Sequence, residues 1–232
     1  MTVQLSLHIL RLLIVISIPF LLVALSARLV MTPPFLQFEY TRPGFPVDPY
    51  GLTTDDRLTY APHALDYLIY AQDISSLEQL NFPDGIPLFN ARELRHMVDV
   101  QILTQAVFTA AFALAAFLAI LTILLWRTPH IRMINRALFE GGLLTIGLIA
   151  LIVIFALASW DTFFTGFHAA FFENDTWYFA YSDTLIRLFP EQFWFDAALA
   201  VGLLTVTGAS SLIFVTWQAG RSAMFTRRAL TS

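Results

Sequence analysis

The chain has 232 residues, of which 57% are hydrophobic and only 13% are charged. A soluble domain carries about 25% charged residues, and a chain of this length cannot bury so much apolar surface in one core, so lipid must be the solvent for much of it. The sequence contains neither Lys nor Cys, which excludes thiol nucleophiles, disulfides and lysine Schiff bases, and its net charge of −4 argues against a nucleic-acid partner.

Four stretches are long and apolar enough to cross a bilayer as helices, which takes about 20 mostly apolar residues. We therefore predict an all-α membrane protein with four transmembrane helices, forming a single integral membrane domain over residues 1–232. In the third stretch, Gly141, Gly142 and Gly147 are expected to allow close helix packing. The four predicted spans cover about residues 7–31, 100–126, 140–160 and 196–218.

The distribution of arginines predicts the orientation. Segments on one side of the four spans carry seven of the 13 arginines and a single acid, Glu140, whereas the other side carries six arginines and sixteen acids. The positive-inside rule then places both termini in the cytoplasm and residues of about 32–99 and 161–195 on the outer side of the membrane. One alternative stays open, because Ala24-Leu25-Ser26 resembles a signal-peptidase site, and cleavage there would leave three spans.

The first outer segment is predicted to form a small, mostly helical and loop-rich cap. A path rich in proline and glycine over residues 40–51 is typical of turns. Thr53 is placed to cap a helix with acids in its first turn, and that helix is expected to run toward Tyr70, with Pro62 bending or splitting it. A second short helix is expected over residues 73–80.

The second outer segment is dominated by aromatic side chains. Residues 160–195 carry 14 aromatics among 36 residues, and nine of them are Phe. Trp and Tyr are enriched at membrane interfaces, but Phe has no polar tip that would favour the headgroup level. We therefore expect this segment to line an apolar groove for acyl chains or to pack under the cap.

Two histidines are candidates for acid–base chemistry. His96 lies directly before the second span, and helical spacing puts Glu93 and Asp99 on the same face as its imidazole. His168 follows the third span at the same membrane depth. Two imidazoles at one interface can move protons near neutral pH. The alternative is that both are hydrogen-bonded bystanders.

The same residues allow a metal site to be considered. Glu93, His96, Asp99 and His168, with Asp175 or Asp183, offer nitrogen and oxygen ligands. The sequence lacks His-Glu-x-x-His and other tightly spaced metal motifs, so we expect no metal and no cofactor.

Several motifs resemble those of the bacterial lipoprotein intramolecular transacylases, the Lit family. The region around each histidine is similar to one of the two family signatures, and the loop before the cap helix is similar to the family's cap entrance. The resemblance extends over nearly the whole chain. The motifs are Phe89-Asn90 with Glu93–Val100, Phe167–Phe172, Asp175–Trp177, Asp183–Pro190, and Pro46–Thr53 with Asp56–Leu58. In a bacterium, the outer side predicted above is the outer face of the cytoplasmic membrane.

The resemblance implies a concrete reaction. Such enzymes move the sn-2 acyl chain of a diacylglyceryl-modified N-terminal cysteine onto the α-amino group of that cysteine, at the outer face of the membrane. The substrate is thus a diacylated lipoprotein embedded in membrane lipid, and the product is the N-acyl, S-monoacylglyceryl lyso-form. The family's two histidines fall on His96 and His168 in this sequence.

We expect His96 to act as the general base, oriented by Glu93 or Asp99, and His168 to stabilise the oxyanion or to return the proton, although the two roles can be exchanged. Two other functions remain alternatives: a metal-assisted membrane hydrolase that uses the same residues, and a non-enzymatic scaffold or binding subunit. The residues expected to support the site or position the substrate are Glu93, Asp99, Asn90, Asp48, Asp175 and Trp177.

Overall fold

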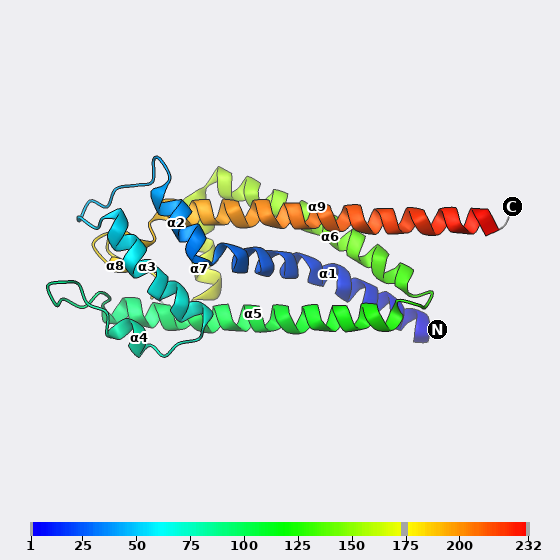
Figure 1. The fold of residues 1–232 in the computed structure, drawn as a ribbon, viewed down its shortest axis with the longest axis horizontal. Helices are drawn as coiled ribbons and strands as arrows, with labels where there is room; N and C mark the ends of the chain where they lie inside the picture. The colour runs from blue at the N-terminus through cyan, green and yellow to red at the C-terminus, as the bar shows by residue number, and fades with distance from the viewer. Residues whose placement is uncertain (1, 173–175, 231–232) are drawn as a thin grey trace. The chain divides into compact units, whose positions relative to one another are not determined.

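The computed structural model describes residues 2–172 and 176–230, which form nine α-helices and no strand longer than an isolated bridge. Four of these helices are long and apolar enough to cross a membrane, which confirms the predicted all-α class and the number of spans. They are shown in Figure 1: α1 (Thr2–Val30), α5 (Ala91–Leu125), α6 (Ile131–Ala158) and α9 (Glu191–Leu230).

The chain divides into two compact units. We call the first the bundle unit; it comprises Met1–Ser26, Thr109–Phe155 and Val201–Ser232. We call the second the cap unit; it comprises Ala27–Phe108 and Ala156–Ala200.

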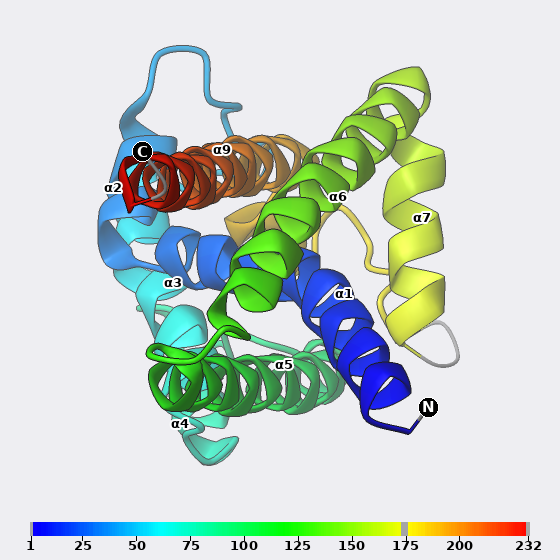
Figure 2. The ribbon, with the colours of Figure 1, turned by 90° about the vertical axis from the view of Figure 1, so that its right-hand side faces the viewer.

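In the bundle unit, α6 packs closely against both α1 and α9 (Figure 2). A Cβ atom added at Gly141 would lie 2.7 Å from Cγ1 of Ile18, and one at Gly142 would lie 2.7 Å from Cγ1 of Ile213. No side chain larger than hydrogen fits at these two positions unless the neighbours move. The prediction of close packing is confirmed for both glycines and is wrong for Gly147, where a Cβ would meet no atom within 4 Å.

An ion-pair cluster joins two helices of the bundle unit. Arg11 binds Glu140, with 2.9 Å between Nε and Oε2, and Arg136 reaches the same carboxylate one turn away on α6. Glu140 was the single acid among the segments predicted to be cytoplasmic, and these two arginines account for it.

The cap unit contains the short helices, whose starts follow from local sequence. Thr53 forms the predicted capping box with Asp56, because each side chain accepts the other residue's backbone N–H. Pro62 lies inside the helix that follows and does not split it. The short helices of the cap unit are α2 (Pro33–Thr41), α3 (Thr54–Ile69), α4 (Ser75–Glu78), α7 (Trp160–Phe171) and α8 (Thr184–Leu188).

Two apolar clusters hold the cap unit together. One surrounds Tyr67 of α3 and includes Met97 of α5 and Leu188 of α8, all at most 3% exposed. The other joins Tyr40 of α2 to Phe193 of α9. Through these contacts, the N-terminal turns of α5 are fixed against helices from both segments of the cap unit.

Candidate active site

The two candidate histidines lie side by side within the cap unit. His96 is on the second turn of α5 and His168 is on α7, and their ring centroids are 6.3 Å apart with an angle of 24° between the planes. The sequence placed both residues at one depth, and the structure brings their imidazoles into a stacked pair. An imidazole pair with this geometry can hand a proton between a substrate and the protein.

Aromatic rings surround the pair. The centroids of the neighbouring rings lie 4.1 to 5.7 Å from those of the imidazoles, within the usual distance of aromatic contacts. All five rings come from the aromatic segment at residues 160–195. The rings are Phe164, Phe167, Phe172, Trp177 and Phe179.

One hydrogen bond assigns the tautomer of His168. Its Nδ1 lies 2.8 Å from the backbone carbonyl oxygen of Phe164. Because a carbonyl oxygen only accepts, Nδ1 must carry the proton, and Nε2 of the neutral ring has a free lone pair. Burial lowers the pKa of His168 below the usual 6.5, and the bond to Phe164 offsets this shift only in part. His168 is therefore a neutral base at neutral pH.

His96 is more deeply buried, with 6% of its surface exposed. Its Nδ1 is buried and has no hydrogen-bond partner among the described residues. Neither Glu93 nor Asp99 makes the hydrogen bond to this ring that the sequence suggested. An unpartnered buried imidazole nitrogen is costly, so it is a natural contact point for a polar substrate group.

Glu93 instead fixes the backbone around the site. One of its oxygens accepts the backbone N–H of Asn90 at 2.7 Å, and the other accepts that of Leu185 at 2.6 Å. The side chain of Asn90 makes the reciprocal hydrogen bond, in which its Oδ1 accepts the backbone N–H of Glu93 at 3.1 Å. This reciprocal cap starts α5, and the bond to Leu185 ties that start to α8.

Asp183, the residue before α8, also connects α8 to the start of α5. Its carboxylate binds Arg92 at 2.8 Å and Asn90 at 3.2 Å, and it also accepts the backbone N–H of Ala180 at 2.9 Å. The segment that carries Phe179 against His96 is thereby attached to the first turn of α5. Asp183 does not pair with Arg187, four residues later, because Arg187 is bound to another carboxylate.

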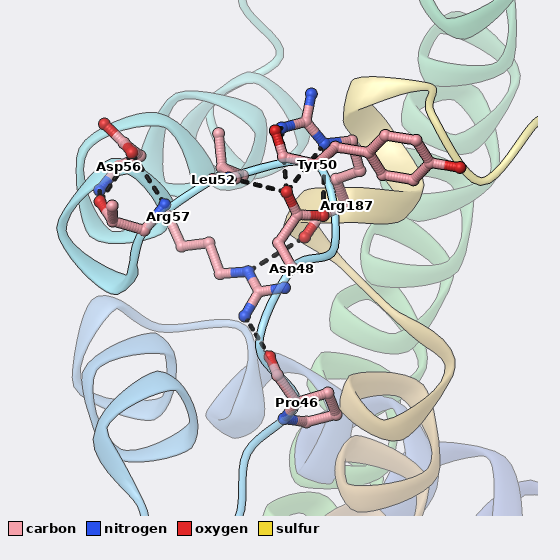
Figure 3. Close-up of polar contacts among 8 residues, drawn as sticks. Pro46, Asp48, Tyr50, Leu52, Asp56, Arg57 and Arg187 are labelled. Carbon is pink, nitrogen blue, oxygen red and sulfur yellow. Dashed lines mark hydrogen bonds and ion pairs between the residues drawn. The ribbon is translucent and has the colours of Figure 1, made fainter.

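The partner of Arg187 is Asp48 (Figure 3). The guanidinium reaches the carboxylate through Nε and Nη2, at 3.1 and 2.9 Å, and Leu52 donates its backbone N–H to the same carboxylate at 2.7 Å. Burial alone would raise the pKa of Asp48, but these hydrogen bonds outweigh it and hold the pKa below its usual range. Asp48 therefore anchors the proline-rich loop to α8 as a carboxylate.

Arg57 supports that anchor from α3. Its buried guanidinium donates to the backbone carbonyl oxygens of Arg187 at 3.0 Å and Pro46 at 2.7 Å, as Figure 3 shows. Sequence reasoning had not singled out Arg57 or Arg92 as parts of the site. Arg57 lies within the cap-entrance motif, whereas nothing in the sequence marked Arg92.

The remaining predicted residues are Trp177, Asp99 and Asp175. The ring of Trp177 lies against His168 in a tilted arrangement, with 4.9 Å between centroids, and Asp99 accepts a long hydrogen bond of 3.5 Å from Thr176. Asp175 lies outside the described residues. Within residues 2–172 and 176–230, no three His, Asp or Glu side chains come together as a metal site, so the metal-hydrolase alternative gains no support from them.

These features define a class of protein: an integral, multi-pass membrane protein whose cap unit holds two stacked imidazoles among aromatic rings. The model of the family described as lipoprotein intramolecular transacylase Lit matches residues 12–194. The chain therefore belongs to the Lit family of acyltransferases, as the sequence motifs indicated.

Other comparisons find a relative of similar length and solved structures with the same fold. An uncharacterized protein of Aquifex aeolicus (strain VF5) is 30% identical over 194 residues, which cover 84% of this chain and 87% of that protein. The structure of Lit from Bacillus cereus superimposes with a TM-score of 0.74 at 21% identity, over 97% of this chain and 99% of that one. A variant of that protein with a histidine replaced by arginine gives a TM-score of 0.70 at 19% identity, over 96% of each chain.

Proposed function

We propose that this protein moves the sn-2 acyl chain of a diacylglyceryl-modified N-terminal cysteine onto the cysteine's own α-amino group, giving an N-acyl, S-monoacylglyceryl lipoprotein. Membership of the Lit family supports the reaction class. The observation that carries the assignment of the site is the stacked imidazole pair, His96 and His168, in its aromatic enclosure.

The chemistry needs a base and no enzyme nucleophile. The α-amino group has a pKa of about 7.7–8.0, so a neutral amine is accessible near pH 7. It attacks the ester carbonyl of its own molecule, and the C–N bond forms as the C–O bond to glycerol breaks. One proton leaves the nitrogen and one arrives on the glyceryl oxygen, so no co-reactant is consumed.

We assign the base to His168, because its Nδ1–H is held by Phe164 and its Nε2 is free to accept the amine proton. The resulting imidazolium then returns that proton to the leaving glyceryl oxygen. His96 supplies an N–H donor to the developing oxyanion. This assignment exchanges the two roles expected from sequence, for the reason that only His168 has a fixed tautomer.

The aromatic enclosure has a separate task. Water that reached the ester would hydrolyse it, and apolar rings around the imidazoles exclude water. The same rings orient the lipid so that amine and ester meet, which can supply several orders of magnitude in rate. Phe172 is best placed for this, since its ring contacts both imidazoles, and Trp177 lies against His168.

The reaction is tested by expressing the chain in a bacterium that makes diacylglyceryl lipoproteins but cannot N-acylate them. Tandem mass spectrometry of a lipoprotein's N-terminal lipopeptide should show an unchanged total mass with one acyl chain on the amine. His96→Asn and His168→Asn should each reduce transfer by about 10²–10⁴-fold.

His63→Asn is the matched control, because this histidine is exposed on α3 of the same cap unit. It should transfer the acyl chain at the rate of the unmodified protein. Full transfer by the His96→Asn/His168→Asn double variant, at equal expression, would contradict the mechanism and favour a scaffold role.

The proposal also places the site at the outer face of the cytoplasmic membrane, with both termini inside, on the basis of the arginine distribution. Because the chain has no Cys, each introduced cysteine is unique. An impermeant maleimide should label Glu78→Cys in intact cells and His130→Cys only after permeabilisation. The reverse pattern would invert the topology.

A further inference from the structure

A cavity of about 700 Å³ lies within the cap unit, and the mechanism above does not use it. Its walls are the loop at Tyr50–Leu52, the turn at Phe82–Leu88, the start of α5 and the start of α8. The volume falls within the range of small-ligand sites, roughly 300–1,000 Å³. Figure 3 shows the contacts that hold one wall, where Asp48 fixes both the loop and Arg187.

The cavity lies next to the imidazoles along α5. Asn90 and Glu93 line it, and His96 follows Glu93 by three residues, which is about 4.5 Å along a helix axis. A second path runs through side chains. Asp183 lines the cavity and binds Arg92, and the Arg92 guanidinium lies 5.8 Å over the ring of Phe179. That ring contacts His96 at 5.3 Å.

The reaction proposed above requires such a space. The reacting amine and the first peptide carbonyl are attached to the same Cα of the cysteine, so the polypeptide begins within a few ångströms of the imidazoles. A polar polypeptide cannot enter hydrocarbon and must leave through the cap. We propose that this cavity binds the first residues after the acylated cysteine of the lipoprotein substrate, and that it favours neutral or basic residues there.

The preference follows from the charges that line the cavity. Four acidic residues line it, Asp56, Asp84, Glu93 and Asp183, of which Asp183 is paired with Arg92. The guanidinium among the lining residues is that of Arg187, already bound to Asp48. An acidic tail residue would therefore meet like charge without a free cation. Tyr50 and Ile86, each more than half exposed, offer apolar contact to small or aliphatic side chains.

Occupancy can be measured without turnover, so this part of the test is independent of the proposed function. A synthetic diacylglyceryl-cysteine peptide that carries benzophenone two residues after the cysteine is mixed with the full-length protein in lipid vesicles and irradiated. Mass spectrometry should locate the label within residues 82–88 or 182–187. A label confined to other parts of the chain would overturn the proposal.

Kinetics test the charge preference. A tail of Ser-Lys-Lys-Lys should give a kcat/KM about fivefold above that of Ser-Glu-Glu-Glu, the effect of one like-charge contact of about 1 kcal/mol. The difference should lie in KM, because the tail does not touch the reacting atoms. Asp84→Asn should reduce the preference, whereas Glu78→Gln, an exposed acid of α4 outside the cavity, should leave it unchanged.

The two hypotheses fail differently. Equal kcat/KM for both tails in the unmodified protein would overturn the cavity proposal while leaving acyl transfer intact. Labelling of residues 82–88 or 182–187 without acyl transfer from any peptide would support the cavity proposal and reject the proposed reaction.

Discussion

The cap unit and the bundle unit use their polar residues in opposite ways. In the bundle unit, polar contacts are few, and close approach of helices at Gly141 and Gly142 determines the packing. In the cap unit, carboxylates join segments that are far apart in sequence, such as Asp48 with Arg187, 139 residues away, and Glu93 with the backbone of Leu185, 92 residues away.

The difference follows from the solvent of each unit. Lipid tails are as apolar as leucine, so helices in a membrane associate through shape rather than through burial of apolar surface. The cap unit contains the short helices and the loops between them, and these loops need specific contacts to hold them. Because both imidazoles belong to the cap unit, their geometry depends on those contacts.

The largest effect is expected from breaking the ion pair between Asp48 and Arg187 in the cap unit. Asp48→Asn removes the charge opposite Arg187, whose side chain is 14% exposed, and leaves a buried cation without a counter-ion. Removing one partner of a buried pair costs about 3–5 kcal/mol. Hydrogen exchange in detergent should speed up for the amides of residues 48–57 and 184–188, while amides of the bundle unit stay protected.

Asp55→Asn is the matched control for this variant, since Asp55 is exposed on the first turn of α3. It should change exchange little. If Asp48→Asn loosened the bundle unit as much as the cap unit, the two units would not be independent in stability, and the comparison would fail.

A smaller effect is expected from the bundle unit. Gly141→Ala brings a Cβ to within 2.7 Å of Cγ1 and 2.8 Å of Cβ of Ile18, and an atom so close to the main chain cannot rotate away. Overpacking of this kind costs about 1–3 kcal/mol, so the temperature of unfolding in detergent should fall. Gly147→Ala, with open space around it, should leave that temperature unchanged or raise it; a fall equal to that of Gly141→Ala would refute the packing argument.

Features set by local sequence were predictable. The four spans follow from runs of apolar residues, and the start of α3 follows from Thr53 and Asp56, three residues apart. The proximity of His96 and His168 was partly predictable, because both residues were expected at the same depth at the membrane interface. The sequence of a membrane protein thus predicts the depth of a residue in the bilayer, which has no equivalent in a soluble protein.

Contacts between distant segments were not predictable from one sequence. Glu93 was expected to orient His96 because of its helical spacing, yet its oxygens accept backbone N–H groups instead. The order of side chains in a sequence does not show which backbone N–H groups a carboxylate will bind. Gly147 was expected to pack like its neighbours because glycine identity alone does not reveal which face of a helix meets another helix.

The smallest expected effect concerns the imidazole that the cap unit buries. The pKa of His168 lies below 6.5 in the folded protein, so below pH 6.5 the unfolded chain takes up a proton at this ring while the folded chain does not. Stability should therefore be lost as the pH falls from 6.5 toward the lowered pKa, by at most about 1.4 kcal/mol per pH unit, and the loss should end below that pKa.

His168→Asn removes this titration, so its unfolding temperature should depend less steeply on pH over that window than that of the unmodified protein. His63→Asn serves as the control, because this ring is exposed on α3. Equal steepness in His168→Asn and the unmodified protein would mean that the ring is as well solvated when folded as when unfolded. The enclosure by Phe164 and Trp177 would then not exclude water, and the protection of the ester from hydrolysis would need another cause.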